Sequence, residues 1–333
     1  MNILVTGATG FIGSHTCVSL LNEGHNLIAF DNFSNSDEKV VDYIKELSGK
    51  NFVFYKADMT DPNEMNFIFS ENKIDCVIHF AGYKAVGEST KIPLDYYHNN
   101  IYGTLCILKA MKAYGVNKII FSSSATVYGK PASLPIKEDF PLSATNPYGN
   151  TKLMLEEILS DLYKSDPDWS IMLLRYFNPV GAHKSGLLFE NPKGVPNNLM
   201  PRLLDVAFGK MAEITVFGDD YDTNDGTGVR DYIHVVDLAY GHVKAIDYVI
   251  NHKGIEAINL GTGMGYSVFD LIQTFEKVNG IKIPYVICPR RPGDIDACYA
   301  DSSKAKELLG WSATLGIEDM CKDAYIAVKK QKE

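Results

Sequence analysis

Short apolar runs alternate with amphipathic stretches through the first half of the chain. This alternation predicts parallel strands joined by helices. We expect strands at 3–5, 27–30, 52–54, 77–78, 119–121 and 171–174, and a helix at 147–163. The runs are almost continuously apolar, as in a sheet covered by helices on both faces. The expected fold is therefore α/β, a Rossmann-type doubly wound parallel sheet that binds ligands at the carboxyl ends of its strands.

This alternation ends after about Tyr176. Residues 178–228 are rich in Gly, Pro, Asn and Asp, with a short helix expected at 199–208 and a strand at 214–217. A helix at 235–248 and a strand at 257–260 are expected to return to the main sheet. The pattern predicts a dinucleotide-binding domain at 1–177, to which about 229–260 return, and a smaller C-terminal lobe at 178–333.

Composition narrows the class of protein. A net charge of −9 argues against binding to nucleic acid or to a membrane surface, because both select broad basic faces. The six cysteines form no Cys-x-x-Cys pair and the eight histidines show no ligand spacing, so no metal site is expected. Free thiols, no signal peptide before the first strand and no apolar run of membrane-spanning length together favour a cytoplasmic protein.

The segment Gly7-Ala8-Thr9-Gly10-Phe11-Ile12-Gly13 stands between the first strand and a helix. Glycines allow a sharp turn and a close approach to a pyrophosphate, and the helix N-terminus adds free N–H groups. Three glycines at this spacing could arise by chance among 27. Their position directly after a first strand favours a loop that binds a nicotinamide dinucleotide.

Acidic and small residues follow the next strands. Asp31 closes the second strand, where a carboxylate accepts hydrogen bonds from ribose hydroxyls and repels a 2′-phosphate. No arginine stands at 32–35, so NAD is favoured over NADP; the alternative is a turn aspartate. Asp58 is either an adenine contact or a solvated turn residue. The segment Phe80-Ala81-Gly82 offers a small, flat surface for the dinucleotide.

A tyrosine and a lysine four residues apart on a helix share one face. The sequence contains four such pairs, namely Tyr114/Lys118, Tyr148/Lys152, Tyr240/Lys244 and Tyr325/Lys329. Only Tyr148 opens the helix that follows the fifth strand, whose end carries Ser122-Ser123-Ser124 and faces the cofactor crevice. Position therefore selects Tyr148 and Lys152.

The chemistry accounts for this combination. A phenol with a pKa of about 10 becomes a base at neutral pH only if its phenolate gains about 4 kcal/mol of differential stabilisation. The Lys152 ammonium near the cofactor ribose, together with the cationic nicotinamide, can supply that order of energy. Ser124 would share the substrate hydroxyl by hydrogen bonding.

Over residues 1 to about 325 the chain resembles the extended short-chain dehydrogenase/reductases, and within them the UDP-glucose 4-epimerase family. The resemblance rests on the glycine loop 7–13, 79–82, 84–89, 122–129, Pro147-Tyr148-Gly149 with Lys152, 174–182, 196–201, 225–235, and Arg290-Arg291 with Gly293-Asp294. It implies a tightly bound NAD+, a UDP-sugar substrate held by the C-terminal lobe, and a homodimer formed through 93–114 and 148–163. The sugar would be oxidised at C4, turned about its diphosphate link and reduced from the other face.

The resemblance also implies residue roles. Tyr148 would be the base, Ser124 its partner, and Lys152 the group that tunes it. The cofactor-binding residues would be Gly7, Gly10, Phe11, Ile12, Gly13, Asp31, Asn32, Asn35, Ser36, Asp58, Met59, Phe80, Ala81, Gly82, Lys84, Asn99, Ser122, Tyr148, Lys152, Tyr176 and Phe177. The substrate-binding residues would be Lys84, Ser124, Tyr148, Asn178, Asn198, Leu199, Thr215, Phe217, Arg230, Arg291, Asp294 and Cys298. For the two arginines the alternative is a surface position, and for Phe217 and Leu199 it is core packing.

One position bears on specificity. Some members of the family carry tyrosine where this chain has Cys298, and a smaller residue there leaves space for a 2-acetamido group. The hypothesis is that UDP-N-acetylglucosamine and UDP-N-acetylgalactosamine are also substrates, unless the neighbouring Tyr299 fills the space.

Three other functions are alternatives to an epimerase. A nucleotide-sugar 4,6-dehydratase or decarboxylase usually has an acidic residue after the fifth strand, whereas 123–127 contain no carboxylate. A non-catalytic NAD-binding sensor commonly lacks the tyrosine–lysine pair. A simple dehydrogenase would release NADH.

Overall fold

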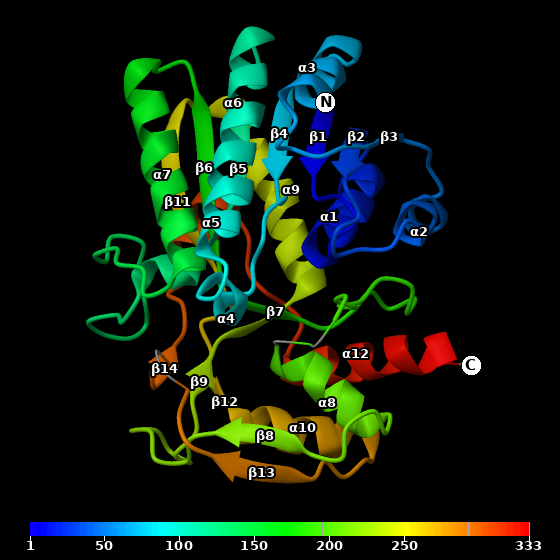
Figure 1. Ribbon diagram of the computed structural model, residues 1–333, viewed down its shortest axis with the longest axis vertical. Helices are drawn as coiled ribbons and strands as arrows, with labels where there is room; N and C mark the ends of the chain where they lie inside the picture. Colours follow the sequence, from blue (N-terminus) through cyan, green and yellow to red (C-terminus); the bar gives the residue numbers. More distant parts are fainter. Residues whose placement is uncertain (195, 197, 292–293, 333) are drawn as a thin grey trace.

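A computed structural model describes residues 1–194, 196, 198–291 and 294–332. A large body built on a central sheet lies at one end of the molecule, and a smaller lobe lies against the carboxyl edge of that sheet (Figure 1). Among the described residues, no helix is both long and apolar enough to cross a membrane.

The central sheet is seven-stranded and parallel throughout. Its strands in spatial order are β11 (Gly254–Leu260), β6 (Ser170–Tyr176), β5 (Lys118–Ser124), β4 (Cys76–His79), β1 (Asn2–Thr6), β2 (Asn26–Asp31) and β3 (Val53–Lys56). The chain proceeds from β1 toward β3 on one side and from β4 toward β11 on the other. The strand order therefore reverses between β1 and β4, which is where doubly wound sheets bind ligands. The expected fold class is confirmed.

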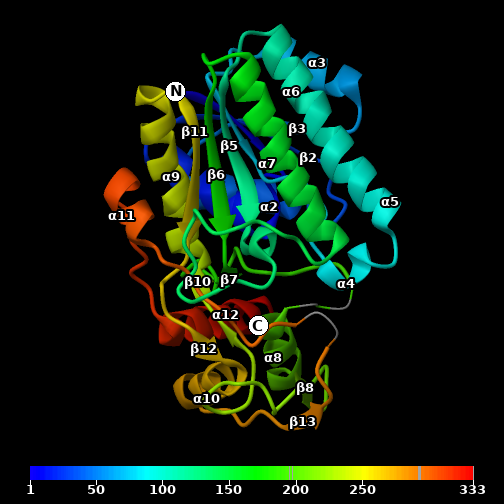
Figure 2. The ribbon, with the colours of Figure 1, turned by 90° about the vertical axis from the view of Figure 1, so that its left-hand side faces the viewer.

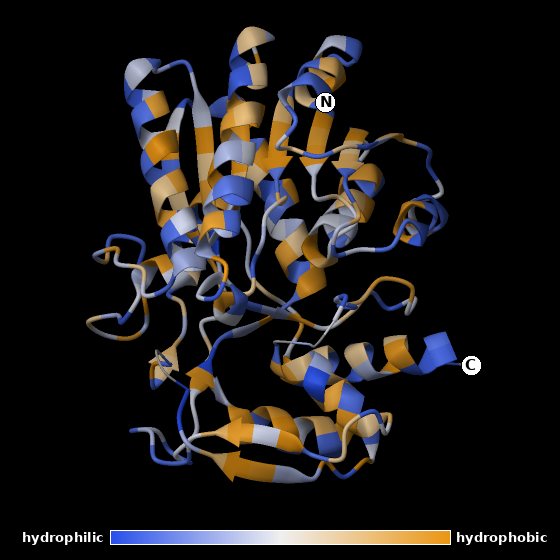
Figure 3. Cartoon of the chain, viewed as in Figure 1, coloured by the Kyte–Doolittle hydropathy of each residue, from blue (hydrophilic) through white to orange (hydrophobic). Residues whose placement is uncertain are grey.

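Helices cover both faces of the sheet (Figure 2). One face is covered by α1 (Phe11–Asn22), α2 (Lys39–Ser48) and α9 (Val235–Asn251), and the other by α3 (Pro62–Glu71), α6 (Gly103–Ala113) and α7 (Pro147–Ser165). Successive side chains of a strand point to opposite faces. Accordingly Ile3 and Val5 pack with α1 and α9, whereas Leu4 packs with the other layer. The strands are hydrophobic over most of their length (Figure 3).

Shorter segments line the carboxyl edge. After β4 come α4 (Val86–Ser89), α5 (Pro93–Tyr96) and a π-helical segment, Tyr97–Tyr102, that leads directly into α6. A 3₁₀ turn, Ala125–Tyr128, follows β5. The sequence pattern does not indicate the π-helical segment, since its residues continue a helical register on either side.

The lobe contains α8 (Leu199–Ala207), α10 (Val268–Asn279) and α12 (Ile317–Lys332) around a small core. Strand β8 (Ile214–Phe217) pairs with β13 (Tyr285–Cys288), and β7 (Asn178–Val180) pairs with β10 (Tyr232–His234). Strand β9 (Val229–Arg230) lies between β12 (Tyr266–Ser267) and β14 (Ala297–Cys298). Helix α11 (Ser303–Leu309) packs against α9 and β11 of the large body.

The expected helices and strands are present, with shifted ends. Strand β11 begins at Gly254 rather than 257, because residues 254–256 pair in register with β6 although they are only partly buried. Helix α8 ends at Ala207, one residue short of the expected end, and α9 runs on to Asn251. Because such ends are only partly buried, they do not appear as apolar runs in the sequence.

Candidate functional site

The loop between β1 and α1 has no room for side chains at Gly7 and Gly13. Gly7 has a φ of 65°, and a Cβ there would lie 2.8 Å from the backbone nitrogen of Ala81. A Cβ on Gly13 would lie 2.2 Å from the Gly7 oxygen. Gly10 is the N-cap residue of α1 and makes no side-chain cap bond, so among the described residues the first N–H groups of the helix, at Phe11 and Ile12, have no side-chain acceptor. The loop therefore fits a pyrophosphate bound at a helix N-terminus.

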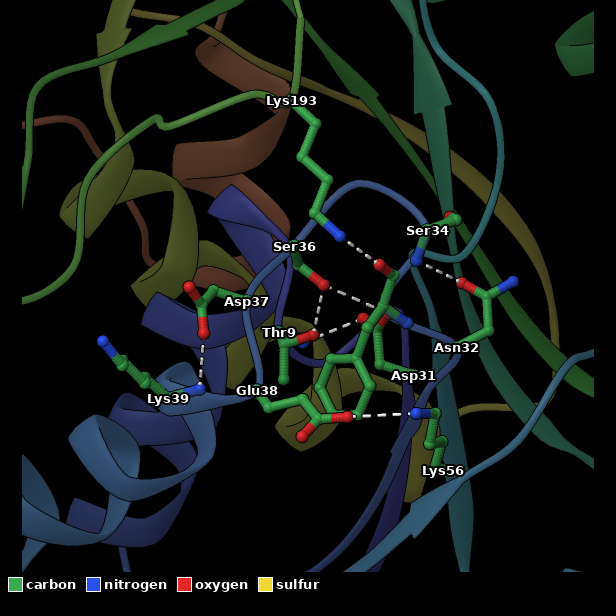
Figure 4. A network of polar contacts seen from close by, with 11 residues as sticks. Thr9, Asp31, Asn32, Ser34, Ser36, Asp37, Glu38, Lys39, Lys56 and Lys193 are labelled. Carbon is green, nitrogen blue, oxygen red and sulfur yellow. Dashed lines mark hydrogen bonds and ion pairs between the residues drawn. The ribbon is translucent and has the colours of Figure 1, made fainter.

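Asp31 is held beside this loop by a polar network (Figure 4). Its Oδ2 accepts from the Thr9 backbone nitrogen at 3.0 Å, and its Oδ1 accepts from the Phe33 nitrogen at 2.9 Å and the Ser36 hydroxyl at 3.3 Å. The Thr9 and Ser36 hydroxyls lie 2.7 Å apart. Two carboxylate oxygens offer about four acceptor positions, so the three bonds leave capacity for a ribose hydroxyl. Asp31 is thus both a structural residue and a candidate ligand.

The residues after β3 lie next to those after β2. The Asn32 amide donates to Asp58 Oδ2 at 2.9 Å, while Asp58 Oδ1 accepts from the Thr60 nitrogen at 2.8 Å. Asp58 therefore stabilises a turn and also accepts a hydrogen bond from Asn32. Met59 is buried against Gly103, where a Cβ would lie 2.7 Å from its side chain.

The segment after β4 is held by an asparagine that the sequence analysis misses. The Tyr83 nitrogen donates to Asn100 Oδ1 at 2.7 Å, and the Asn100 amide donates to Tyr83 O and Thr151 Oγ1, each at 3.0 Å. Asn100 is buried, whereas the expected Asn99 is half-buried and donates to Asn100 at 3.0 Å. Both lie in the π-helical segment, a feature that often marks functional sites. The adjacent asparagines Asn99 and Asn100 could have indicated this role, but the sequence does not show which of the two side chains points inward.

Tyr148, Lys152 and the end of β5 meet at the carboxyl edge of the sheet. Lys152 Nζ donates to the Ser122 carbonyl at 2.5 Å and lies 6.0 Å from the centre of the Tyr148 ring. Burial raises the pKa of Tyr148 above its ordinary value, and a hydrogen bond with Ser124 partly offsets the rise. Burial also lowers the pKa of Lys152 to about 8, opposed by the negative charge of Glu156. The three expected catalytic side chains are therefore brought together.

The other tyrosine–lysine pairs lie elsewhere. Tyr114 follows the end of α6, at the amino end of β5. Tyr240 is exposed on α9 with its Lys244 ammonium 5.2 Å from the ring centre, and Tyr325 lies on α12.

A buried ion pair lies beside the end of β5. Arg175 donates to Glu156 through Nε at 3.0 Å and Nη2 at 2.7 Å, and the Ser123 hydroxyl donates to the same carboxylate at 2.5 Å. Arg175 Nη1 also donates to the Tyr128 hydroxyl at 2.9 Å. Since a buried charge is tolerated when it is paired and hydrogen-bonded, this network fixes β5 against α7 and β6. Glu156 was not among the expected residues.

Two aromatic residues close β6. Tyr176 is buried, and its hydroxyl donates to His242 Nε2, because His242 Nδ1 is used by the Leu238 carbonyl. Burial raises the pKa of Tyr176. His242 in turn lies 4.7 Å from Phe80, ring centre to ring centre. These contacts form one wall at the carboxyl ends of β4 and β6, beside Ala81 and Gly82.

The expected substrate residues of the lobe gather around Asp294. Asp294 Oδ2 accepts from Arg291 Nε at 2.9 Å, and its Oδ1 lies 3.7 Å from Arg230 Nη2. The Arg291 guanidinium lies 5.1 Å from the centre of the Phe217 ring. Phe217 therefore also contacts a site residue, in addition to its strand pairing in β8. Thr215 lies on the same strand, with the same intermediate exposure.

Other expected residues lie at the junction of body and lobe. Asn178 is the first residue of β7 and is exposed. Its backbone nitrogen donates to the Asp231 carbonyl at 2.9 Å. Leu199, the first residue of α8, packs against the lobe core. Asn198 and Lys84 both contact Glu190, which the sequence analysis does not identify. Asn197 and Gly293, which belong to motifs of the family resemblance, lie outside the described residues.

Cys298 lies where the lobe meets the large body. It packs against an apolar cluster that includes Phe177, Val127 and Tyr128, and β14 pairs it with Arg230 of β9. The neighbouring Tyr299 points elsewhere, since a Cβ on Gly265 would lie 3.0 Å from its ring. The Tyr299 ring therefore lies beside Gly265, whereas Cys298 packs against the cluster that contains Phe177.

Comparisons with known proteins agree with this arrangement. The family model described as GDP-mannose 4,6 dehydratase matches residues 4–324. UDP-glucose 4-epimerase of Bacillus subtilis (strain 168) is 59% identical over 325 residues, 98% of this chain and 96% of that protein. The UDP-glucose 4-epimerase of Bifidobacterium longum in complex with NAD+ and UDP superposes with a TM-score of 0.97 at 55% identity, covering 100% of this chain and 99% of the other. The UDP-Glc/GlcNAc 4-epimerase of Campylobacter jejuni superposes with a TM-score of 0.86 at 35% identity, covering 99% of each chain.

The parallel sheet, the glycine loop and the tyrosine–lysine pair after β5 define the class as a short-chain dehydrogenase/reductase of the extended type. Within that class, similarity extends over nearly the whole length of both chains. The chain belongs to the UDP-glucose 4-epimerase family.

Proposed function

We propose that this protein interconverts UDP-glucose and UDP-galactose by oxidation at C4, rotation of the 4-keto sugar and reduction from the opposite face, with NAD+ retained throughout. One observation carries the proposal: Tyr148, Ser124 and Lys152 converge at the sheet edge beside the glycine loop. NAD, when bound, supplies the redox chemistry at the sugar carbon.

The protein's own residues move the proton and hold the substrate. Tyr148 takes the proton of the C4 hydroxyl and returns it, and Ser124 shares that hydroxyl through a hydrogen bond. Lys152 is fixed by the Ser122 carbonyl and keeps a positive charge beside the phenol. Because burial raises the pKa of Tyr148, that charge and the charge of the bound cofactor are both needed for the phenolate to form near neutral pH.

The lobe holds the nucleotide rather than the sugar. Arg230 and Arg291 carry planar forks suited to a diphosphate, and both reach toward Asp294. A sugar that must present both faces to the cofactor cannot be gripped tightly, so binding energy has to act on UDP. The position of the arginines supports this division of roles.

The three competing functions differ in their outcome. A dehydratase makes a dehydrated sugar, a simple dehydrogenase releases NADH, and a sensor makes no product. The dehydratase reading is disfavoured because Ser123 to Val127 contain no carboxylate for a second proton transfer. A non-catalytic sensor is disfavoured because Tyr148 and Lys152 are both present, with the ammonium 6.0 Å from the ring centre. Purified protein given UDP-galactose should form UDP-glucose with no net NADH. Accumulation of NADH or of a dehydrated sugar, or no product at all, would contradict the proposal.

We further propose activity on UDP-N-acetylglucosamine and UDP-N-acetylgalactosamine. Support comes from Cys298, a small side chain packed with Phe177, and from Tyr299, which points toward Gly265. The similar protein of Campylobacter jejuni is named for both glucose and N-acetylglucosamine substrates.

The remaining proposals concern organisation. We propose an NAD-binding domain at 1–177 with 229–260, a UDP-sugar lobe at 178–333, a homodimer formed through 93–114 and 148–163, and a cytoplasmic location. Exposed apolar side chains in the dimer ranges, Leu94, Tyr102 and Met154, support the homodimer. Cysteines without disulfides support a reducing compartment. Light scattering of the purified protein tests the dimer, because a monomeric mass would contradict it.

A further inference from the structure

Glu190 is a nearly buried carboxylate between the two halves of the site. It lies in the segment between β7 and α8, and 9% of its side chain is exposed. Its Oε1 accepts from Lys84 Nζ at 3.1 Å and from Asn198 Nδ2 at 2.7 Å. Lys84 belongs to the segment after β4, and Asn198 directly precedes α8 of the lobe, at its N-cap position. One oxygen atom therefore joins a residue of the cofactor side to a residue of the substrate side.

The second oxygen of Glu190 sets it apart from an ordinary surface ion pair. Oε2 is buried and has no hydrogen-bond partner among the described residues. Leaving a buried acceptor unsatisfied is unfavourable, and more so when the group carries charge. Lys84, in contrast, is half exposed. Stability alone gives no reason to bury a carboxylate here, so the placement points to a role in the site.

Lys193 attaches the same segment to the other side of the glycine loop. Its backbone nitrogen donates to Asn35 Oδ1 at 3.0 Å, and its Nζ donates to the Phe33 carbonyl at 2.7 Å (Figure 4). Phe33 and Asn35 follow β2, whereas Lys84 follows β4. Strands β2 and β4 are the two neighbours of β1, whose end carries the glycine loop. Residues 190–193 therefore link the segment after β4 to the segment after β2, the two strands that flank β1.

We propose that residues 190–193 form a clasp over the bound dinucleotide and that Glu190 is a positioning residue, which holds Lys84 and Asn198 in the orientations that bind the two ligands. The inference rests on the proposed function, since it assigns NAD to the glycine loop and UDP to the lobe. It adds a physical link between the two sites: the clasp originates in the lobe and closes over the cofactor. Glu190 acts through Lys84 and Asn198 and takes no part in proton transfer.

The test uses two variants of the clasp and one matched control. Glu190→Gln keeps the size of the side chain and removes its charge, and Lys193→Met removes the bond to Phe33 while keeping the stem. The control, Glu318→Gln, breaks an exposed pair with Lys277 that measures 2.8 Å and lies in the same lobe. The dinucleotide retained after gel filtration and its rate of loss on dilution are measured first, and UDP affinity is then measured by calorimetry.

We expect Glu190→Gln and Lys193→Met to lose dinucleotide about 10-fold faster than wild type or more, as for the loss of a hydrogen bond to a charged group. Glu190→Gln should also weaken UDP binding, whereas Lys193→Met should leave it unchanged. Wild-type retention in Glu190→Gln would overturn the proposal, and so would tighter UDP binding, which would make Glu190 a competitor for Lys84 and Asn198. If Glu190→Gln fails to fold, the test rests on Lys193→Met. Dinucleotide retention in Lys193→Met equal to that of the Glu318→Gln control would then overturn the clasp. A wild type that carries no dinucleotide and forms no UDP-glucose overturns the proposed function instead.

Discussion

The ammonium of Lys152 lies 6.0 Å from the centre of the Tyr148 ring, one turn further along α7. It is held there by the Ser122 carbonyl, so the lysine is fixed to the strand end rather than to the phenol itself. Its charge therefore acts on Tyr148 through space. This geometry makes the two residues separable by mutation.

Replacing Tyr148 by phenylalanine should lower kcat for UDP-galactose by about 10²–10⁴-fold, the usual contribution of a general acid–base. UDP affinity should stay at the wild-type value, because the phenol does not contact the nucleotide in the proposed site. The matched control is Tyr325→Phe, which alters a pair of identical spacing on α12. A near-normal kcat in the Tyr148→Phe variant would show that Tyr148 is not the base.

The rate should fall as the pH rises through about 8, because burial lowers the pKa of Lys152 to about 8 and its positive charge is lost above that value. A Lys152→Met variant should be slow at every pH and lack this fall. Stability should change in the opposite direction. Between pH 8 and 10.5 the unfolded chain binds the lysine proton and the folded chain does not, so the contribution of Lys152 to unfolding free energy rises with pH. Rates and denaturant midpoints over pH 6–11, compared between the two proteins, check both signs.

Cys298→Tyr should abolish turnover of UDP-N-acetylgalactosamine and spare UDP-galactose, because a phenol ring is much larger than the thiol that now packs against the cluster containing Phe177. Cys321→Ser, in the lobe core away from β14, controls for the loss of a cysteine. Product analysis by chromatography distinguishes the two sugars. Absence of N-acetyl activity in the wild type would refute the specificity hypothesis.

Arg230→Met and Arg291→Met should each weaken UDP binding by about 10-fold or more, since a charge-assisted hydrogen bond contributes about 1.5–3 kcal/mol. Lys253→Met, which removes an exposed partner of Asp168 on the large body, should leave the affinity unchanged. Calorimetric titration with UDP measures the effect. Equal affinity in all four proteins would show that the arginines are ordinary surface residues.

Gly13→Ala should expel the dinucleotide, because the added Cβ would lie 2.2 Å from the Gly7 oxygen and the loop would have to shift. Overpacking of this kind costs about 1–3 kcal/mol. At Gly316 an added Cβ would have as its nearest contact a flexible carboxylate at 3.9 Å, so Gly316→Ala is the control. Absorbance of the dinucleotide released on denaturation measures retention; equal amounts in both variants would contradict the assigned loop.

The sequence predicts the sheet and the glycine loop well because each depends on neighbours along the chain. Ile3 to Val5 and Ile119 to Phe121 are buried on both sides, so their burial is visible as apolar runs. The choice of Tyr148 among four pairs also needs only the order of elements. In these cases local pattern and position carry the information.

The remaining features depend on contacts between distant segments. The bond between Glu190 and Lys84 joins residues 106 positions apart, in segments without periodicity. The choice between Asn99 and Asn100 depends on a π-helical turn, which changes the direction of side chains within an otherwise helical stretch. The pairing of Glu156 with Arg175 depends on how α7 packs on β6. No repeat or spacing in the sequence encodes these relationships.

Strand β11 pairs with β6 from Gly254↔Ser170 to Leu260↔Tyr176, after the chain has already built the first half of the lobe. During synthesis, the edge of β6 therefore stays unpaired until residue 260 has left the ribosome. By then β7 to β10 and α8 are present, and α9 connects them back to α1. The last strand of the sheet thus forms only in a chain that already carries much of the lobe. A truncation before residue 254 would make the fully buried strand β6 the edge of the sheet in place of the partly buried β11, and such an apolar edge is prone to aggregation.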